Sequence, residues 1–67
     1  MALRYYLNTE PDDHGVHIVH REDCQYLPRE DHRKALGRAA SCATALRRAR
    51  AEAEPVKGCH TCAPDCR

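Results

Sequence analysis

HREDC at residues 20–24 and CHTC at residues 59–62 are the two stretches of this 67-residue sequence that decide how it folds. The first has the form H-x3-C and the second has the form C-x2-C. Zinc takes imidazole and thiolate ligands in a tetrahedron, and structural sites usually draw them from two short clusters that the fold brings together. The spacing therefore predicts a single zinc site, formed by His20, Cys24, Cys59 and Cys62, that ties the first third of the chain to its end.

The composition predicts one small domain, residues 1–67, that needs help to stay folded. The chain has no Phe and no Trp, and many of its apolar residues are alanines. A chain of this length buries a smaller fraction of its surface than a larger one does and is only marginally stable alone. Small scaffolds with thin cores generally rely on a metal, on disulfides or on a partner subunit. Five cysteines and five histidines supply the means for the first two.

The choice between a metal and disulfides depends on where the protein works. The N-terminal residues lack the apolar segment of a secretory signal, and no stretch approaches the roughly 20 apolar residues of a membrane span. Both observations predict a cytoplasmic protein, in a compartment that keeps thiols reduced. An odd number of cysteines also fits poorly with a fully paired disulfide framework. Zinc is therefore the expected cofactor.

The fourth ligand stays open between two residues. Cys66 would complete an all-thiolate site with Cys24, Cys59 and Cys62. His20 is preferred because Cys66 lies next to the C-terminus, where chains are usually poorly ordered. Cys42 is expected to be a small buried apolar residue. The other four histidines are expected to face solvent: His14, His17, His32 and His60.

The first third of the chain predicts a β-hairpin. Residues 3–7 and 16–20 alternate in the way that half-buried strands do, and the turn-rich residues 8–15 lie between them. In the second strand, Ile18 and His20 share a face. If Ile18 points to the core, His20 does so too, which suits a buried ligand.

A helix is expected to run from Cys42 to about Glu54 and to stop before Pro55. Ser41 is a good N-cap, because its side-chain oxygen can accept a backbone N–H of the first turn. One helix face is apolar, formed by Cys42, Ala45, Leu46, Ala49 and Ala53. Residues 29–34 are all polar and predict an exposed loop. The expected fold is thus a small zinc-stabilised α+β domain, in which the N-terminal hairpin packs on one C-terminal helix and the C-x2-C knuckle closes the chain.

The order of these motifs resembles the small Ada-like metal-binding modules. In those modules an H-x3-C-x-Y-L segment precedes a helix that opens with S-x3-A, and a Gly-led C-x-x-C pair follows. The matching segments here are residues 20–27, 41–45 and 58–62. The resemblance covers residues 16–63 and implies a zinc-binding hairpin and helix, with ligands at His20, Cys24, Cys59 and Cys62.

The resemblance does not imply DNA repair. The Ada repair domain uses four cysteines, one of which accepts a methyl group from DNA phosphotriesters, and His20 stands where the first of them would be. Gly58 also precedes Cys59 without the Arg-Pro-Cys lead-in of that family. The chain looks closer to stand-alone bacterial relatives, for which the family name conveys architecture rather than activity.

For function, the sequence predicts a structural zinc module that acts as a monomeric binding protein and not as an enzyme. Four protein ligands would leave no coordination position for water, and no Ser-His-Asp constellation or phosphate-binding Gly loop is visible. An unknown protein partner is expected.

Two other interpretations stay open. A basic face would contact nucleic-acid phosphates, although the net charge is only +1. It would consist of Arg47, Arg48 and Arg50 on the helix, with Arg33, Lys34 and Arg38 nearby in sequence. Alternatively, the zinc cysteines would act as an alkyl acceptor or a redox sensor.

Overall fold

Four strands and one α-helix make up the part of the chain that the computed structural model describes, residues 2–59. The strands are β1 (Leu3–Asn8), β2 (His17–Arg21), β3 (Arg33–Ala39) and β4 (Val56–Gly58), the helix is α1 (Cys42–Arg50), and a short 3-10 helix, η1, spans Glu30–His32. The strands form one mixed sheet in the order β3-β1-β2-β4. The predicted α+β class is confirmed, and β3 and β4 are additions to the predicted hairpin.

The N-terminal hairpin forms as predicted, but the core face of its second strand is the opposite one. β1 pairs antiparallel with β2 and places Leu7 opposite Val19. Tyr5, Leu7 and Val19 are all buried in the main apolar cluster. Neighbouring residues of a strand point to opposite faces, so Ile18 and His20 lie on the face away from this cluster. The expectation that Ile18 marks the main core face is therefore wrong, and His20 is buried on the other side of the sheet.

β3 and η1 replace the exposed loop predicted for residues 29–34. β3 pairs antiparallel with β1, and the register shifts at Tyr5–Tyr6. Gly37 has a φ of 79°, the left-handed conformation that suits one type of β-bulge. Because the bulge adds one residue, Leu36 and Ala39 are both buried in the main apolar cluster. A regular strand would place residues three apart on opposite faces.

α1 begins where the sequence predicts and ends earlier. Ser41 has an extended backbone, and its hydroxyl accepts the Thr44 N–H at 3.4 Å. The predicted apolar face is confirmed, since three of its residues are buried and two more pack against them: Cys42, Ala45, Ala49, Leu46 and Ala53. The regular helix ends at Arg50 and not at Glu54, because the chain turns back to add β4 to the sheet.

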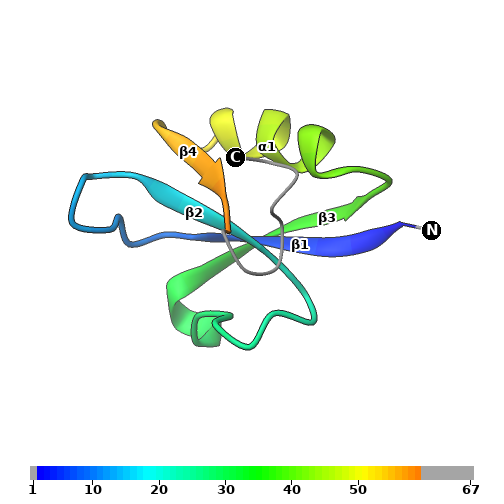
Figure 1. Cartoon of the computed structure of the whole chain (residues 1–67), viewed down its shortest axis with the longest axis horizontal. Helices are drawn as coiled ribbons and strands as arrows, with labels where there is room; N and C mark the ends of the chain where they lie inside the picture. The colour runs from blue at the N-terminus through cyan, green and yellow to red at the C-terminus, as the bar shows by residue number, and fades with distance from the viewer. Residues whose placement is uncertain (1, 60–67) are drawn as a thin grey trace.

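β3, α1 and β4 carry the chain from one edge of the described sheet to the other. β4 runs parallel to β2, with Gly58 opposite Val19, and β1 and β2 lie between β3 and β4. Figure 1 shows α1 on one side of the strands, whereas the connection from β2 to η1 swings to the other side. The two faces of the sheet therefore have different covers: the helix on the Val19 face and this connection on the His20 face.

Arg48 fastens α1 to β3. Its guanidinium donates to the backbone carbonyls of Leu36, at 3.1 Å, and of Arg38, at 2.5 Å. β3 forms one edge of the described sheet, so an edge strand receives two of its hydrogen bonds from a helix side chain. A partly buried carbonyl that lacks a partner destabilises a fold, and Arg48 supplies that partner for Leu36.

Replacing Gly37 with alanine is expected to destabilise the fold by about 1–2 kcal/mol, because a left-handed backbone brings Cβ too close to the following carbonyl oxygen. Crowding does not cause the loss, since an added Cβ would lie 3.6 Å from the flexible end of Arg48. Gly37→Asn is the matched variant, because asparagine adopts this conformation more readily. Urea denaturation should show a smaller loss for the asparagine variant. If the alanine variant is as stable as the wild type, the left-handed backbone conformation at Gly37 is contradicted.

Candidate metal centre

Two strand ends and one tight turn bring three of the predicted ligands together. His20 lies near the end of β2. Cys24 follows the turn after β2, where its N–H donates to the Arg21 carbonyl at 3.0 Å. Cys59 comes directly after β4, and its N–H donates to the Val19 carbonyl at 2.8 Å. The parallel pairing of β4 with β2 therefore carries Cys59 to the end of the strand that holds His20.

The side chains of His20, Cys24 and Cys59 form a group with metal-ligand spacing. Their ligand atoms all lie within 4.8 Å of one another. The Cys24 Sγ lies 3.5 Å from the His20 Nδ1 and 3.8 Å from the Cys59 Sγ. Zn–S bonds of about 2.3 Å and a Zn–N bond of about 2.0 Å at tetrahedral angles separate two sulfurs by about 3.8 Å and sulfur from nitrogen by about 3.5 Å. Both Cys24 distances agree with this geometry, with Nδ1 as the imidazole donor.

Burial of this group favours the form of His20 that binds a metal. His20, Cys24 and Cys59 expose only 5%, 8% and 6% of their surface. Burial lowers the pKa of His20 below its ordinary value, because the charged imidazolium loses hydration in the interior. The imidazole is thus neutral at pH 7, and neutral imidazole is the form that coordinates metals. Neither Cys24 nor Cys59 is in a disulfide, so both keep a thiol that can become a thiolate ligand.

Cys42 takes no part in the metal group. It is buried on the face of α1 that packs in the main apolar cluster, on the other side of the sheet from His20. It is also disulfide-bonded, so its sulfur is not a thiolate donor. The expectation of a buried residue is confirmed, but Cys42 is more than a small apolar side chain.

Three residues of the predicted site region lie outside the described residues: His60, Cys62 and Cys66. The closing C-x2-C knuckle and the fourth ligand at Cys62 therefore stay predictions, as does the choice between His20 and Cys66. Within residues 2–59, the group with metal-ligand spacing consists of His20, Cys24 and Cys59.

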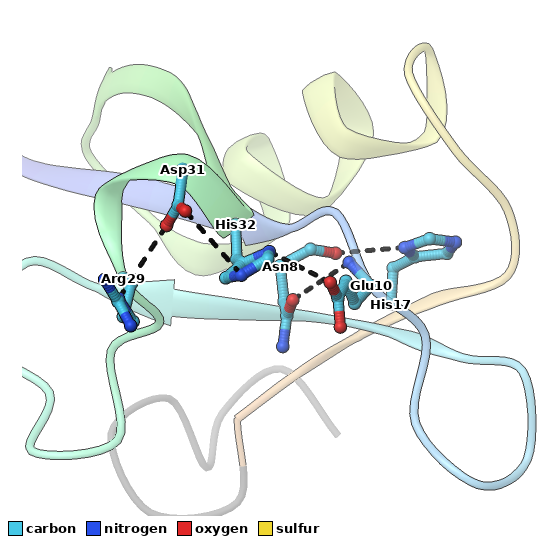
Figure 2. A network of polar contacts seen from close by, with 6 residues as sticks. All are labelled: Asn8, Glu10, His17, Arg29, Asp31 and His32. Atoms are coloured by element: carbon cyan, nitrogen blue, oxygen red, sulfur yellow. Dashed lines mark hydrogen bonds and ion pairs between the residues drawn. The ribbon is translucent and has the colours of Figure 1, made fainter.

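Two other histidines contact the last residue of β1 and the loop that follows it, instead of the metal group. The His17 Nδ1 lies 3.0 Å from the Asn8 carbonyl oxygen, and the His32 Nδ1 lies 2.9 Å from a carboxylate oxygen of Glu10. Figure 2 shows both histidines in one area of polar contacts between the hairpin and η1. Both residues are half-buried, whereas His14 is exposed. The expectation that these histidines face solvent is confirmed for His14 alone.

Several basic residues of the predicted nucleic-acid face are used within the chain. The Arg33 guanidinium carbon lies 4.7 Å from the centroid of the Tyr6 ring, and the guanidinium donates to a backbone carbonyl. Lys34 pairs with Glu52, and Arg48 donates to two carbonyls of β3. Three more basic residues are exposed: Arg38, Arg47 and Arg50. The basic residues of the predicted face are therefore divided into two groups: some make contacts within the chain, and the others are exposed.

A cleft of about 440 Å³ borders the metal group. Its lining residues are Asp12, Ile18, His20, Tyr26, Lys57, Gly58 and Cys59. Two of the three metal-ligand candidates, His20 and Cys59, thus reach the cleft, whereas Cys24 is not among its lining residues. Tyr26 has 61% of its surface exposed. No sequence motif marks this cleft, because its walls come from segments that are far apart in the chain.

Comparison with known proteins does not add a family to this geometry: no protein-family model, no curated protein and no solved structure matches the chain. The resemblance to Ada-like modules therefore rests on the motifs of the sequence. α1 has nine residues, and among residues 2–59 no helix has the length and apolar character that membrane crossing requires.

Proposed function

We propose that this chain is a structural zinc module, in which His20, Cys24 and Cys59 supply three ligands and Cys62 supplies the fourth. The spacing of the Cys24 sulfur from the His20 nitrogen and the Cys59 sulfur, at 3.5 Å and 3.8 Å, carries the proposal. Thiolates and imidazole in a tetrahedral arrangement select zinc over the hard cations calcium and magnesium, which prefer oxygen ligands.

The role of the zinc is to hold distant parts of a thin fold together. The ligands come from the end of β2, from the turn after it and from the end of β4, so one ion joins a central strand to an edge strand of the described sheet. A zinc site closed by four protein ligands has no open coordination position for a reacting water. Closed coordination of this kind is typical of structural zinc sites. We therefore assign the chain no enzymatic activity. Its thiol ligands suit a reducing compartment such as the cytoplasm, whereas the Cys42 disulfide does not.

The biological role that fits such a module is binding of a protein partner. The exposed Tyr26 lies at the cleft beside the metal group, and tyrosine is enriched at protein interfaces. Nucleic-acid binding is the weaker candidate, because Arg33, Lys34 and Arg48 already contact other parts of the chain. Phosphate binding needs a concentrated basic footprint, and this one is diffuse. The motifs that resemble Ada-like modules agree with a zinc-binding architecture without fixing the partner.

Native mass spectrometry with metal analysis tests the zinc site. The wild type is expected to carry one zinc ion per chain. Loss of a residue that only hydrogen-bonds to a metal ligand typically weakens metal binding about 10–100-fold. His20→Ala and Cys24→Ser remove a ligand itself, so their zinc affinity is expected to fall by more than about 100-fold. His17→Ala is the matched control, because His17 lies on the same strand but bonds to the Asn8 carbonyl. It should keep full zinc occupancy.

The same measurement decides the remaining ligand. Cys62→Ser is expected to lose zinc, whereas Cys66→Ser is expected to retain it. Full occupancy in His20→Ala together with loss in Cys66→Ser would replace His20 by Cys66 in the site. A wild type that carries no zinc after purification without chelators would reject the proposed function.

A further inference from the structure

The two sulfurs of the metal group are close enough to react with each other. The Cys24 Sγ and the Cys59 Sγ lie 3.8 Å apart, both residues are buried, and neither is in a disulfide. A disulfide has an S–S length of about 2.05 Å, so the two sulfurs need to approach by less than one bond length. Their residues come from the turn after β2 and from the end of β4, and β4 is paired directly with β2. The pair is thus held together by the fold and not by proximity in sequence.

The two cysteines are buried to a similar degree but differ in their contact with the cleft. Cys59 lines the cleft of about 440 Å³, together with His20 and the exposed Tyr26, and Cys24 does not. Of the two cysteines, Cys59 is therefore the one that a small solute in the cleft contacts. The Cys24 Sγ lies 3.8 Å from the Cys59 Sγ, within reach of the product. A reactive thiol at a surface opening with a second thiol next to it is the usual arrangement of a reversible redox pair.

We infer that Cys59 and Cys24 form a redox couple that hydroperoxides oxidise to a disulfide, with release of the metal. In the first step the Cys59 sulfur attacks the terminal peroxide oxygen. An S–O bond forms, the O–O bond breaks, and the departing oxygen takes a proton and leaves as water or an alcohol. Cys59 is now a sulfenic acid, and the hydroperoxide has received two electrons.

In the second step the Cys24 sulfur attacks the Cys59 sulfur. An S–S bond forms, the S–O bond breaks, and the hydroxide that leaves takes up a proton to give water. In total, two thiols and one hydroperoxide give one disulfide, one water and one further water or alcohol. Because metal binding requires deprotonated thiolates, the disulfide removes two of the three described donors at once. The oxidised chain therefore releases its zinc, an outcome that rests on the proposed function.

Peptide mapping of the full chain tests the couple. The zinc-loaded protein is first reduced so that the Cys42 disulfide is open, the reductant is removed, and an equimolar amount of hydrogen peroxide is added. Zinc release is followed with a chromogenic chelator, and the remaining thiols are then blocked. Trypsin separates the sulfurs, because Cys24 falls in peptide 22–29, Cys42 in peptide 39–47 and Cys59 in peptide 58–67. The expected first product joins peptides 22–29 and 58–67 and has lost the mass of two hydrogen atoms. Fragmentation of this product should place the bridge at Cys59, ahead of Cys62 and Cys66.

Two variants strengthen the test. Cys66→Ser should give the same bridge, whereas Cys24→Ser should leave Cys59 as a sulfenic acid or a more oxidised form. A bridge from Cys59 to Cys62 in the wild type, or zinc release while Cys24 is still a thiol, would overturn the couple. A protein that forms the Cys24–Cys59 bridge but holds no zinc would keep the couple and reject the proposed function. A protein that binds zinc and resists oxidation at Cys24 would keep the proposed function and reject the couple.

Discussion

Removal of zinc with a strong chelator under reducing conditions is expected to unfold this chain. A folded domain of this size has a net stability of about 3–10 kcal/mol, and structural zinc contributes about 10–16 kcal/mol of apparent binding free energy in zinc-finger peptides. The described core cannot replace that contribution, because the largest fully buried side chains in residues 2–59 are Leu7 and Val19. Thermal melting followed by circular dichroism should show a cooperative transition that disappears when the chelator is added.

Two controls isolate the effect of the metal. The reductant alone should leave the zinc-loaded chain folded, which separates metal loss from reduction of the Cys42 disulfide. Addition of excess zinc after chelation should restore the cooperative transition. The result that contradicts the expectation is a metal-free chain, verified by metal analysis, that melts as cooperatively as before.

Leu7→Ala is expected to cost about 2–5 kcal/mol of stability, the range observed when a buried leucine is truncated and leaves a cavity. Leu7 exposes 2% of its surface and lies opposite Val19 at the centre of the main apolar cluster. Against a total of about 3–10 kcal/mol, this single change removes a large share of the stability. Urea denaturation of the zinc-loaded protein measures the loss as a lower midpoint.

Leu46→Ala is the control for the Leu7 substitution. It removes the same atoms from a residue that is only partly buried and packs at the margin of the same cluster. Its loss of stability should be clearly smaller, because less apolar surface returns to water and the site can collapse more easily. If both variants lose the same stability, the core is not centred on the hairpin strands.

The features that the sequence predicted correctly are local ones. Alternation of apolar and polar residues over a few positions is enough to indicate β1 and β2. The hydroxyl of Ser41 is a local signal for the start of a helix. The three described metal-ligand candidates are the exception, because cysteine and histidine spacing indicates coordination chemistry even when the two clusters are far apart in the chain. His20, Cys24 and Cys59 lie together although most of the chain separates the first from the last.

The strands β3 and β4 were missed for different physical reasons. In β3 the bulge at Gly37 disrupts the two-residue period, so Leu36 and Ala39 do not alternate with polar residues as strand residues normally do. β4 is only three residues long and depends on parallel pairing with β2. Such a strand exists because of its distant partner and leaves almost no signal of its own.

The face of β2 shows a limit of pattern analysis. Val16, Ile18 and Val19 make both faces of this strand partly apolar, so alternation cannot decide which face meets the helix. The structure places Val19 in the main cluster and His20 on the opposite face. His20 is buried there by the turn that carries Cys24 and by the end of β4, and neither neighbour is visible in the local sequence.

The Arg48 contact has a further consequence for the β3 edge of the described sheet. An uncovered edge strand is a template on which strands of other molecules can add, and natural sheets block such growth with charges and bulges. At the β3 edge, two carbonyls already accept hydrogen bonds from the Arg48 guanidinium, and Gly37 distorts the strand between them. An incoming strand would have to displace the Arg48 guanidinium, and the bulge at Gly37 would still interrupt its hydrogen bonding to β3. We therefore expect the contact that joins helix to sheet to disfavour the addition of a second molecule at this edge.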